Sequence, residues 1–234
     1  MKKLLLSLTV IAAVVITAMS FRSNNGEYKS EFRNVDTFKG INLKLPADVY
    51  LKQGAEQSVK IEAEEKVLSL ITTEIKKGSL IIDHERTLKN FNNVKIYITV
   101  SNLESVSING SGNVISETLF KGSNLDLSIA GSGDVKMALD YSKLSLSIAG
   151  SGNIQLSGRA SIQDISIAGS GDIKSIDLIS EKAKVSIAGS GSCTLDTKDL
   201  DASIAGSGDI FYKSTPANIS TSISGSGTVK AAKS

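Results

Sequence analysis

The chain has 234 residues, of which 5% are aromatic and none is Trp, and it contains 20 Gly but only 2 Pro. So few aromatic residues disfavour a globular core around large rings and favour a core of stacked aliphatic layers. The formal net charge is +2, and it becomes zero when the first 20 residues, which hold two lysines, are set aside. A neutral chain lacks the basic surplus that nucleic acid attracts, so we expect no nucleic-acid partner.

Residues 1–20 have the pattern of an export signal. Two lysines precede an apolar run from Leu4 to Met19, and Ala18 and Ser20 are small residues at the spacing that a signal peptidase cleaves. The run has 16 residues, whereas a membrane-spanning helix needs about 20, so we favour a cleaved signal peptide over a retained anchor. The sequence therefore predicts an exported protein, located in the periplasm, on the outer-membrane surface or outside the cell.

The part before residue 101 reads as a linker followed by short strands. Residues 21–30 are polar and predict a linker, after which a single domain is expected over 31–234. Within 31–100 we expect irregular N-terminal coils or a cap, with one or two helical turns near 64–71. Lys77-Gly78 predicts the turn of a hairpin over 72–83. Alternating apolar residues predict further strands at 41–45, 49–51, 59–63 and 94–100.

Residues 101–234 contain seven copies of one motif, apolar–small–Gly–Ser–Gly–polar–apolar. The isoleucines that open the copies are spaced by 21, 19, 19, 20, 17 and 19 residues. This period matches one coil of a solenoid, so we predict an all-β parallel β-helix of about 19–20 residues per coil. Consecutive hairpins that wrap into an antiparallel structure also fit the period. One corner motif per repeat favours the helical winding.

The serine of each motif is predicted to lie at a corner between two apolar positions that face the core. Glycine on both sides permits positive φ and the close approach of neighbouring coils. The repeats contain no His that could activate a serine nucleophile, so we interpret the serines as structural corners. They are Ser111, Ser132, Ser151, Ser170, Ser190, Ser207 and Ser226.

A polar residue follows the second glycine of each motif and is expected to form an outward row beside the corner. Such residues cap turns, and the same row is our candidate surface for contact with a glycan or a cation. Calcium is disfavoured, because three of the seven positions are Asp and the ion takes about six to eight oxygens. We therefore expect no metal and no other cofactor. The candidate contact residues are Asn113, Asp134, Asn153, Asp172 and Asp209.

Several stretches occur in an order that is much more specific than the Gly-Ser-Gly repeat. They are FKGINL (38–43), ADVYLKQG (47–54), VKIEA (59–63), GSLII (78–82), VKIYITV (94–100) and LESVSINGSGNV (103–114). With these stretches the chain resembles, over roughly residues 33–229, the auto-transporter adhesin family that carries the head GIN domain, common in Bacteroidetes-type bacteria. The resemblance implies an exported β-helical protein and brings no catalytic residues with it.

The pattern predicts a non-catalytic envelope or cell-surface protein, an adhesin or a structural solenoid. The partner it suggests is a cell-surface glycan or an envelope protein, and a homo-oligomer is compatible with flat ladder faces. The alternative is a glycan- or lipid-binding module, which needs a groove or an exposed apolar patch. Phe211-Tyr212 is the place where we look for such a patch, although a capping contact near the last coil is favoured there.

A polysaccharide-active enzyme is the third interpretation. Asp134 and Asp172 lie two coils apart, a spacing that an inverting pair of carboxylates tolerates. His84 stands among charged residues, and we expect a solvated loop there, not a catalytic base. Cys193 occupies a column otherwise filled by Val and Ile, which indicates a small buried hydrophobe.

Overall fold

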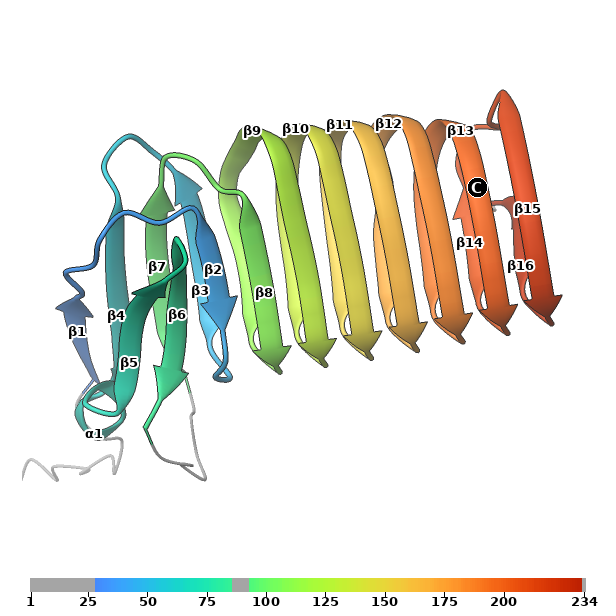
Figure 1. The fold of residues 1–234 in the computed structure, drawn as a ribbon. Helices are drawn as coiled ribbons and strands as arrows, with labels where there is room; N and C mark the ends of the chain where they lie inside the picture. Colours follow the sequence, from blue (N-terminus) through green and yellow to red (C-terminus); the bar gives the residue numbers. More distant parts are fainter. Residues whose placement is uncertain (1–27, 86–92, 233–234) are drawn as a thin grey trace, which may run out of the picture.

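The computed structural model describes residues 28–85 and 93–232, which form a flattened β-solenoid with a mixed strand region at one end (Figure 1). The predicted signal peptide and residues 21–27 of the predicted linker lie outside the described residues. A first strand begins at Tyr28, which pairs with Glu64. The linker predicted over 21–30 therefore extends three residues too far, because main-chain pairing orders residues 28–30 despite their polar side chains.

The strands fall into an N-terminal group and a repeat group, with one short helix between β4 and β5. The first group is β1 (Tyr28–Phe32), β2 (Gly40–Leu43), β3 (Asp48–Gln53), β4 (Ser58–Glu64), α1 (Glu65–Leu68), β5 (Ile71–Lys76), β6 (Ser79–His84) and β7 (Lys95–Val100). The second is β8 (Ser105–Gly110), β9 (Asn113–Gly131), β10 (Asp134–Gly150), β11 (Asn153–Gly169), β12 (Asp172–Gly189), β13 (Ser192–Gly206), β14 (Asp209–Tyr212), β15 (Asn218–Gly225) and β16 (Thr228–Ala231).

Each long strand from β9 to β13 bends in the middle and so contributes to two walls of the solenoid (Figure 1). We call the residues that lead into a Gly-Ser-Gly corner the entry wall and those that follow it the exit wall. Successive coils pair in parallel, and Ile129, Ile148 and Ile167 lie in register. This confirms the predicted parallel β-helix and excludes the antiparallel hairpin alternative.

Coils of unequal length keep their corners aligned by absorbing extra residues as bulges. The longest spacing between motifs is matched by a register shift between Lys136 and Ala138, and the shortest by a shift between Ser175 and Ile179. Both shifts lie after the polar residue that follows the corner and before the bend in the middle of the long strand. The corner columns therefore stay continuous although the period varies.

The core consists of aliphatic columns, because alternate residues of each strand point inward. Ile148 and its neighbour two residues earlier, Leu146, are 1% and 2% exposed, as predicted for these positions. Cys193 is fully buried in its column of Ile and Val side chains, and burial raises the pKa of its thiol to about 12. The last coil differs, since Ile219 and Ile223 are 41% and 43% exposed. No described coil covers them.

The N-terminal strands extend both walls and then close the end of the solenoid. β2 and β6 continue the entry wall beyond β8, and β3 and β7 continue the exit wall beyond β9. β4 and β1 follow β7 in antiparallel pairing, which ends the parallel stack. The predicted hairpin is confirmed as β5–β6, with positive φ at Lys77 and Gly78. The expected helical segment is the single turn of α1. Among the described helices, none is long and apolar enough to span a bilayer.

Candidate functional site

The corner serines form a ladder through their main chain. The N–H of Ser151 donates to the carbonyl oxygen of Gly131 at 2.9 Å, and the N–H of Ser170 donates to that of Gly150 at the same distance. Gly150 has a φ of +134°, and a Cβ there would collide with the carbonyl oxygen of Gly131. The seven serine side chains are exposed. These main-chain contacts fit the structural role that we predicted for the serines, and they come from the place of the serines in the backbone.

The polar row beside the corners is a ladder of hydrogen-bonded pairs. Asp134 Oδ1 accepts from the backbone N–H of Asn153 at 3.1 Å and from its Nδ2 at 2.8 Å. Asp172 Oδ1 accepts in the same way from the N–H and hydroxyl of Ser192, at 3.0 and 2.8 Å. The third pair joins Asp209 Oδ1 to the N–H of Thr228 at 3.0 Å and to its hydroxyl at 2.7 Å.

The ladder continues into the N-terminal strands, where sequence reasoning did not place it. Asp48 of β3 pairs in register with Asn113 and accepts from its Nδ2 at 2.8 Å. A carboxylate therefore alternates with a neutral donor from Asp48 to Thr228, and no two ladder carboxylates occupy adjacent rungs of the described coils. Adjacent rungs are only about 4.8 Å apart. This alternation avoids like-charge repulsion and gives each carboxylate a partner.

A groove of about 330 Å³ lies over this ladder on the exit wall. Asn113, Asp134 and Asn153 form one side, and Lys136 and Lys174 are among the residues of the other side. The structure thus brings three of the five candidate contact residues together in one groove. Asp172 and Asp209 belong to the same ladder but do not line it.

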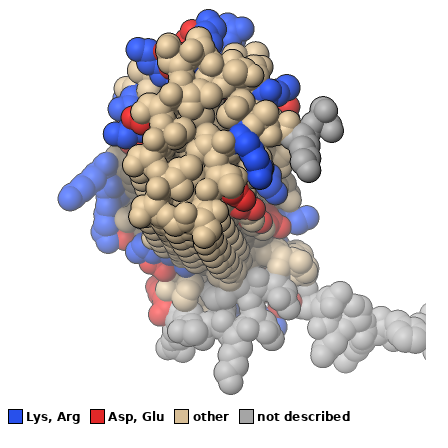
Figure 2. Space-filling model, turned by 90° about the vertical axis from the view of Figure 1, so that its right-hand side faces the viewer, with Lys and Arg blue, Asp and Glu red and all other residues tan. Residues whose placement is uncertain are grey.

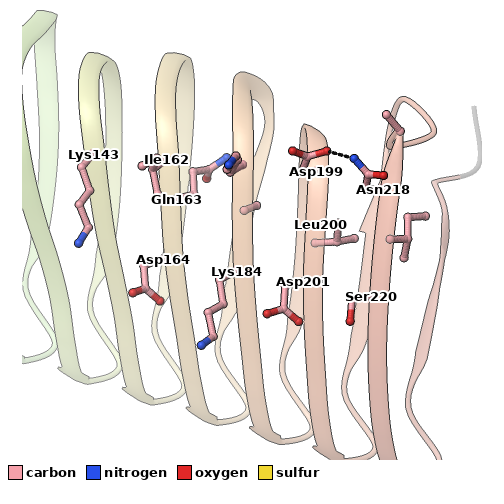
Figure 3. Close-up of a pocket in the computed structure, with 14 residues that line it drawn as sticks. Lys143, Ile162, Gln163, Asp164, Lys184, Asp199, Leu200, Asp201, Asn218 and Ser220 are labelled. Carbon is pink, nitrogen blue, oxygen red and sulfur yellow. Dashed lines mark hydrogen bonds between the residues drawn. The ribbon is translucent and has the colours of Figure 1, made fainter.

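A larger groove of about 860 Å³ lies on the entry wall and crosses several coils (Figure 3). Asp164, Lys184 and Asp201 lie in register on successive coils and line it with charges of alternating sign, and Lys143 lines it from the neighbouring outward row. Exposed aliphatic surface is contributed by Ile162, which is 44% exposed. Asn218 Nδ2 donates to Asp199 Oδ1 at 2.7 Å near the end of the groove.

Sequence reasoning missed the entry-wall groove. Its charged residues stand three or five positions before each motif isoleucine, where the repeat shows no constant residue type. The only available signal was that these positions alternate with inward apolar ones, which predicts an outward direction. A groove forms where a row of short side chains lies between rows of longer ones. Only the register between coils shows which residues share a row.

Gln163 is a buried polar residue that borders the entry-wall groove. It is fully buried, and its Nε2 donates to Ser180 Oγ at 2.9 Å. Its Oε1 has no hydrogen-bond partner in the described structure. The neighbouring rungs of its column are Leu144 and Ala183. The amide therefore interrupts an otherwise apolar column.

The aromatic residues of the repeats do not form an open platform for sugars. Phe120 and Tyr141 are buried, and burial is the main cause that raises the pKa of Tyr141 to about 12. Phe211 and Tyr212 are half-buried on β14, and Lys230 Nζ lies 5.3 Å from the centre of the Phe211 ring. The favoured capping role of this pair is wrong, because β16 of the last coil continues the sheet beyond β14.

Two tyrosines of the N-terminal strands stack on the outer face of the exit wall. The ring centres of Tyr50 and Tyr97 are 5.3 Å apart, and Lys60 Nζ lies 4.9 Å from the centre of the Tyr97 ring. Sequence reasoning missed this pair, although both tyrosines stand two residues after the start of a strand. One face of each ring is covered by its stacking partner, and Lys60 lies over the Tyr97 ring, so the pair offers little open surface to a sugar.

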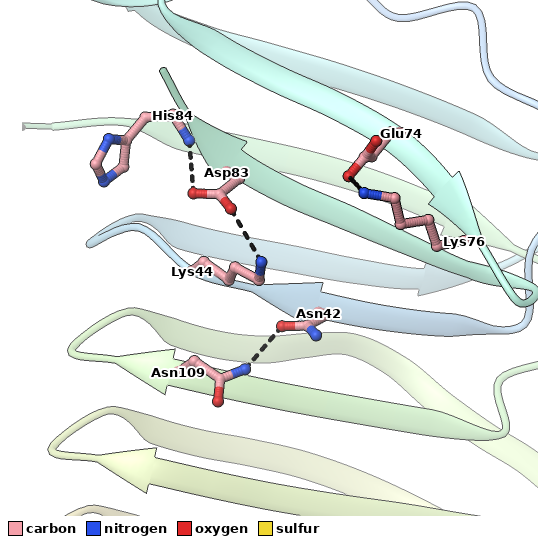
Figure 4. Close-up of polar contacts among 7 residues, drawn as sticks. All are labelled: Asn42, Lys44, Glu74, Lys76, Asp83, His84 and Asn109. Atoms are coloured by element: carbon pink, nitrogen blue, oxygen red, sulfur yellow. Dashed lines mark hydrogen bonds and ion pairs between the residues drawn. The ribbon is translucent and has the colours of Figure 1, made fainter. Parts of the chain in front are cut away.

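His84 lies at the end of β6 and not in the solvated loop that the sequence predicted (Figure 4). The strand continues to this residue because it pairs with Ile71 of β5. The His84 N–H donates to Asp83 Oδ1 at 2.8 Å, and Lys44 Nζ lies 3.0 Å from Asp83 Oδ2. The backbone hydrogen bond and the nearby Lys44 lower the pKa of Asp83. Over residues 28–85 and 93–232, no three His, Cys, Asp or Glu side chains gather as metal ligands.

Fold and site together define a β-solenoid with a hydrogen-bonded polar ladder and grooves on both walls. Residues 37–216 match the family model described as "Putative auto-transporter adhesin, head GIN domain". The chain belongs to this family, as the resemblance of its motifs indicated. No curated protein matches the chain.

Solved structures of Bacteroidetes proteins share this fold. A "putative adhesin" from Bacteroides fragilis is 28% identical, with a TM-score of 0.84 over 88% of this chain and 97% of that one. A "putative lipid binding protein" from Parabacteroides distasonis is also 28% identical, with a TM-score of 0.73 over 89% of this chain and 98% of the other. A "putative adhesin" from Parabacteroides merdae, at 24% identity and a TM-score of 0.72 over 89% and 98%, supports the fold alone.

Proposed function

We propose that this chain is an exported, non-catalytic protein of the cell envelope or cell surface that binds an extended ligand along its entry wall. The observation that carries the proposal is the entry-wall groove, which crosses several coils and combines exposed Ile162 with the row Asp164, Lys184 and Asp201. Alternating donors and acceptors beside an aliphatic surface suit a polyhydroxylated chain such as a surface glycan. Membership of the adhesin family supports a binding role.

Binding without turnover is supported by the state of the ladder carboxylates. Asp134 and Asp172, the pair considered for an inverting glycosidase, each accept two hydrogen bonds from the next coil. A general base in that reaction must instead activate water on one side of a bound sugar. We therefore assign these carboxylates to the structure of the solenoid.

The proposal is tested by applying the processed protein, expressed with its own leader and purified after export, to an array of bacterial and host glycans. We expect binding that falls on the order of tenfold in the double variant Lys184→Ala, Asp201→Ala, because both polar contacts are lost. Lys52→Ala, an exposed lysine of β3 away from the groove, is the matched control. Absence of glycan binding, or release of new reducing ends from a bound polysaccharide, contradicts the proposal.

Location is tested separately on intact cells. A protease added from outside should cleave the protein if it is displayed on the surface, whereas a periplasmic protein is protected until the outer membrane is opened. An N-terminal sequence that begins after Ser20 in the purified protein would support the predicted leader. Recovery of the chain only from the cytoplasm contradicts export.

Lipid binding is the second candidate. It is favoured by the exposed aliphatic side chain of Ile162 in the groove and by the solved relative described as lipid-binding. Co-sedimentation with vesicles made from lipids of the producing bacterium distinguishes the candidates. Lipid binding predicts retention of the chain on vesicles and its loss in Ile162→Ser, with no glycan signal.

A further inference from the structure

We propose that two copies of this chain join end to end through β15, which pairs antiparallel with β15 of the second copy. On one side β15 pairs with β13, and on its other side no described strand pairs with it. All eight of its residues, Asn218–Gly225, are exposed. The inward positions Ile219 and Ile223, whose equivalents Leu200 and Ile204 are buried in the preceding coil, are 41% and 43% exposed.

This edge lacks the features that normally prevent strands from pairing. Protein edges are blocked by charged side chains, proline or bulges. From Asn218 to Val229 the chain has no charged residue and no proline. The preceding coil carries Asp199 and Asp201 where β15 has Asn218 and Ser220. In Figure 2 the end of the solenoid is mostly free of charged side chains, which lie toward its margin.

The residue order of β15 fits a two-fold partner in particular. Residues 219–223 read Ile-Ser-Thr-Ser-Ile, which is the same in both directions from Thr221. Antiparallel pairing centred on Thr221 therefore places Ile219 opposite the partner's Ile223 and Ser220 opposite the partner's Ser222. Such β-branched pairs stabilise antiparallel strands, and a two-fold interface uses one patch on both copies.

The pairing would also complete one end of the entry-wall groove. Asn218 and Ser220 line that groove, and the proposed register sets them opposite the partner's Ser224 and Ser222. The second copy thus borders the groove at its open end. The dimer does not depend on the ligand, so its test is separate from the test of glycan or lipid binding.

The first test is the mass in solution of the processed full-length protein, measured by sedimentation at several concentrations. We expect a dimer whose Kd rises on the order of tenfold or more in Ser222→Lys, because a lysine on a strand edge opposes pairing. The matched control is Ser166→Lys, which lies in the same outward row three coils earlier and should leave the Kd unchanged. A monomer at every concentration up to about 1 mM overturns the proposal, as does equal weakening by both variants.

The second test fixes the register. Antiparallel partners have Cα atoms about 4.5–5.5 Å apart, which suits a disulfide. Thr221→Cys should therefore form a covalent dimer under mild oxidation, whereas Ser166→Cys should not. Cys193 is fully buried and does not compete. A dimer that Thr221→Cys fails to cross-link overturns the pairing centred on this residue, even if Ser222→Lys itself is poorly folded.

Discussion

Gln163 shows what one buried amide costs inside an aliphatic column. Its rung lies between Leu144 and Ala183, its Nε2 bonds to Ser180, and its Oε1 is buried without a partner. Burying such an amide oxygen without a hydrogen bond costs roughly 1–3 kcal/mol in proteins. Ser180 accepts this bond and keeps its own donated bond without the glutamine, because its hydroxyl donates to the carbonyl oxygen of Asp196 at 3.2 Å.

We therefore predict that Gln163→Leu increases the free energy of unfolding by about 1 kcal/mol, because a side chain of similar size removes the unsatisfied oxygen. The reverse change one coil earlier, Leu144→Gln, should decrease it by about 2–3 kcal/mol. Urea unfolding followed by circular dichroism measures both values. Destabilisation by Gln163→Leu would mean that a ligand or a water pairs with Oε1.

At the scale of the coil, the corner depends on its glycines more than on its serines. Gly150→Ala forces a Cβ against the carbonyl oxygen of Gly131 at a φ of +134°. We expect a loss of about 2–4 kcal/mol, from strain and from weakened pairing of adjacent coils. Ser151→Ala keeps the N–H that donates to Gly131, so it should change stability by less than about 0.5 kcal/mol. Thermal unfolding of the two variants compares them directly, and similar losses in both would contradict this account of the corner.

The polar ladder also acts at the scale of several coils, because its stability depends on carboxylates that alternate with neutral donors from one coil to the next. Asn153→Asp removes the Nδ2–H donated to Asp134 and creates three carboxylates on consecutive rungs, since Asp172 lies on the other side. We expect a loss of about 1–3 kcal/mol at pH 7. The repulsive part of this loss should shrink under acidic conditions, because protonation removes the charge that carboxylates carry.

Asn153→Ser is the control for the ladder. It keeps a hydroxyl donor of the kind that Ser192 provides to Asp172, so its stability should stay near that of the parent protein at both pH values. Denaturant unfolding at pH 7 and pH 4 gives the comparison. An Asn153→Asp variant with the same deficit at both pH values would show that lost hydrogen bonding, and not charge, is responsible.

At the scale of the whole molecule, the sequence predicted the features that recur in every coil and missed those that differ from coil to coil. The motif spacing and the alternation around each isoleucine were enough to predict parallel coils, buried columns and exposed corners. The spacings of 17 to 21 residues between motifs gave no indication of where bulges accommodate the difference in coil length. Asp48 joined the ladder from a strand 65 residues away from Asn113, and a local period carries no information about such a pairing. The grooves follow from the same register.

The alternation of the ladder also predicts how the solenoid responds to the loss of a coil. Stability of a repeat protein is approximately a sum of coil and interface contributions, so a deletion that keeps the register should still fold. Deleting residues 151–169 joins Gly150 to Ser170 and preserves one intact corner. It also removes Asn153 and sets Asp134 beside Asp172, two carboxylates about 4.8 Å apart along the axis.

One substitution should therefore have different effects on stability in two backgrounds. In the full chain Asp172 accepts from Ser192, so Asp172→Asn should be neutral or lower the free energy of unfolding by about 1 kcal/mol. In the deletion variant the same change removes like-charge repulsion and should raise the free energy by about 1–2 kcal/mol at pH 7. A double-mutant cycle from denaturant unfolding measures the coupling. If Asp172→Asn has the same effect in both backgrounds, the ladder does not act as a charge-alternating unit along the solenoid.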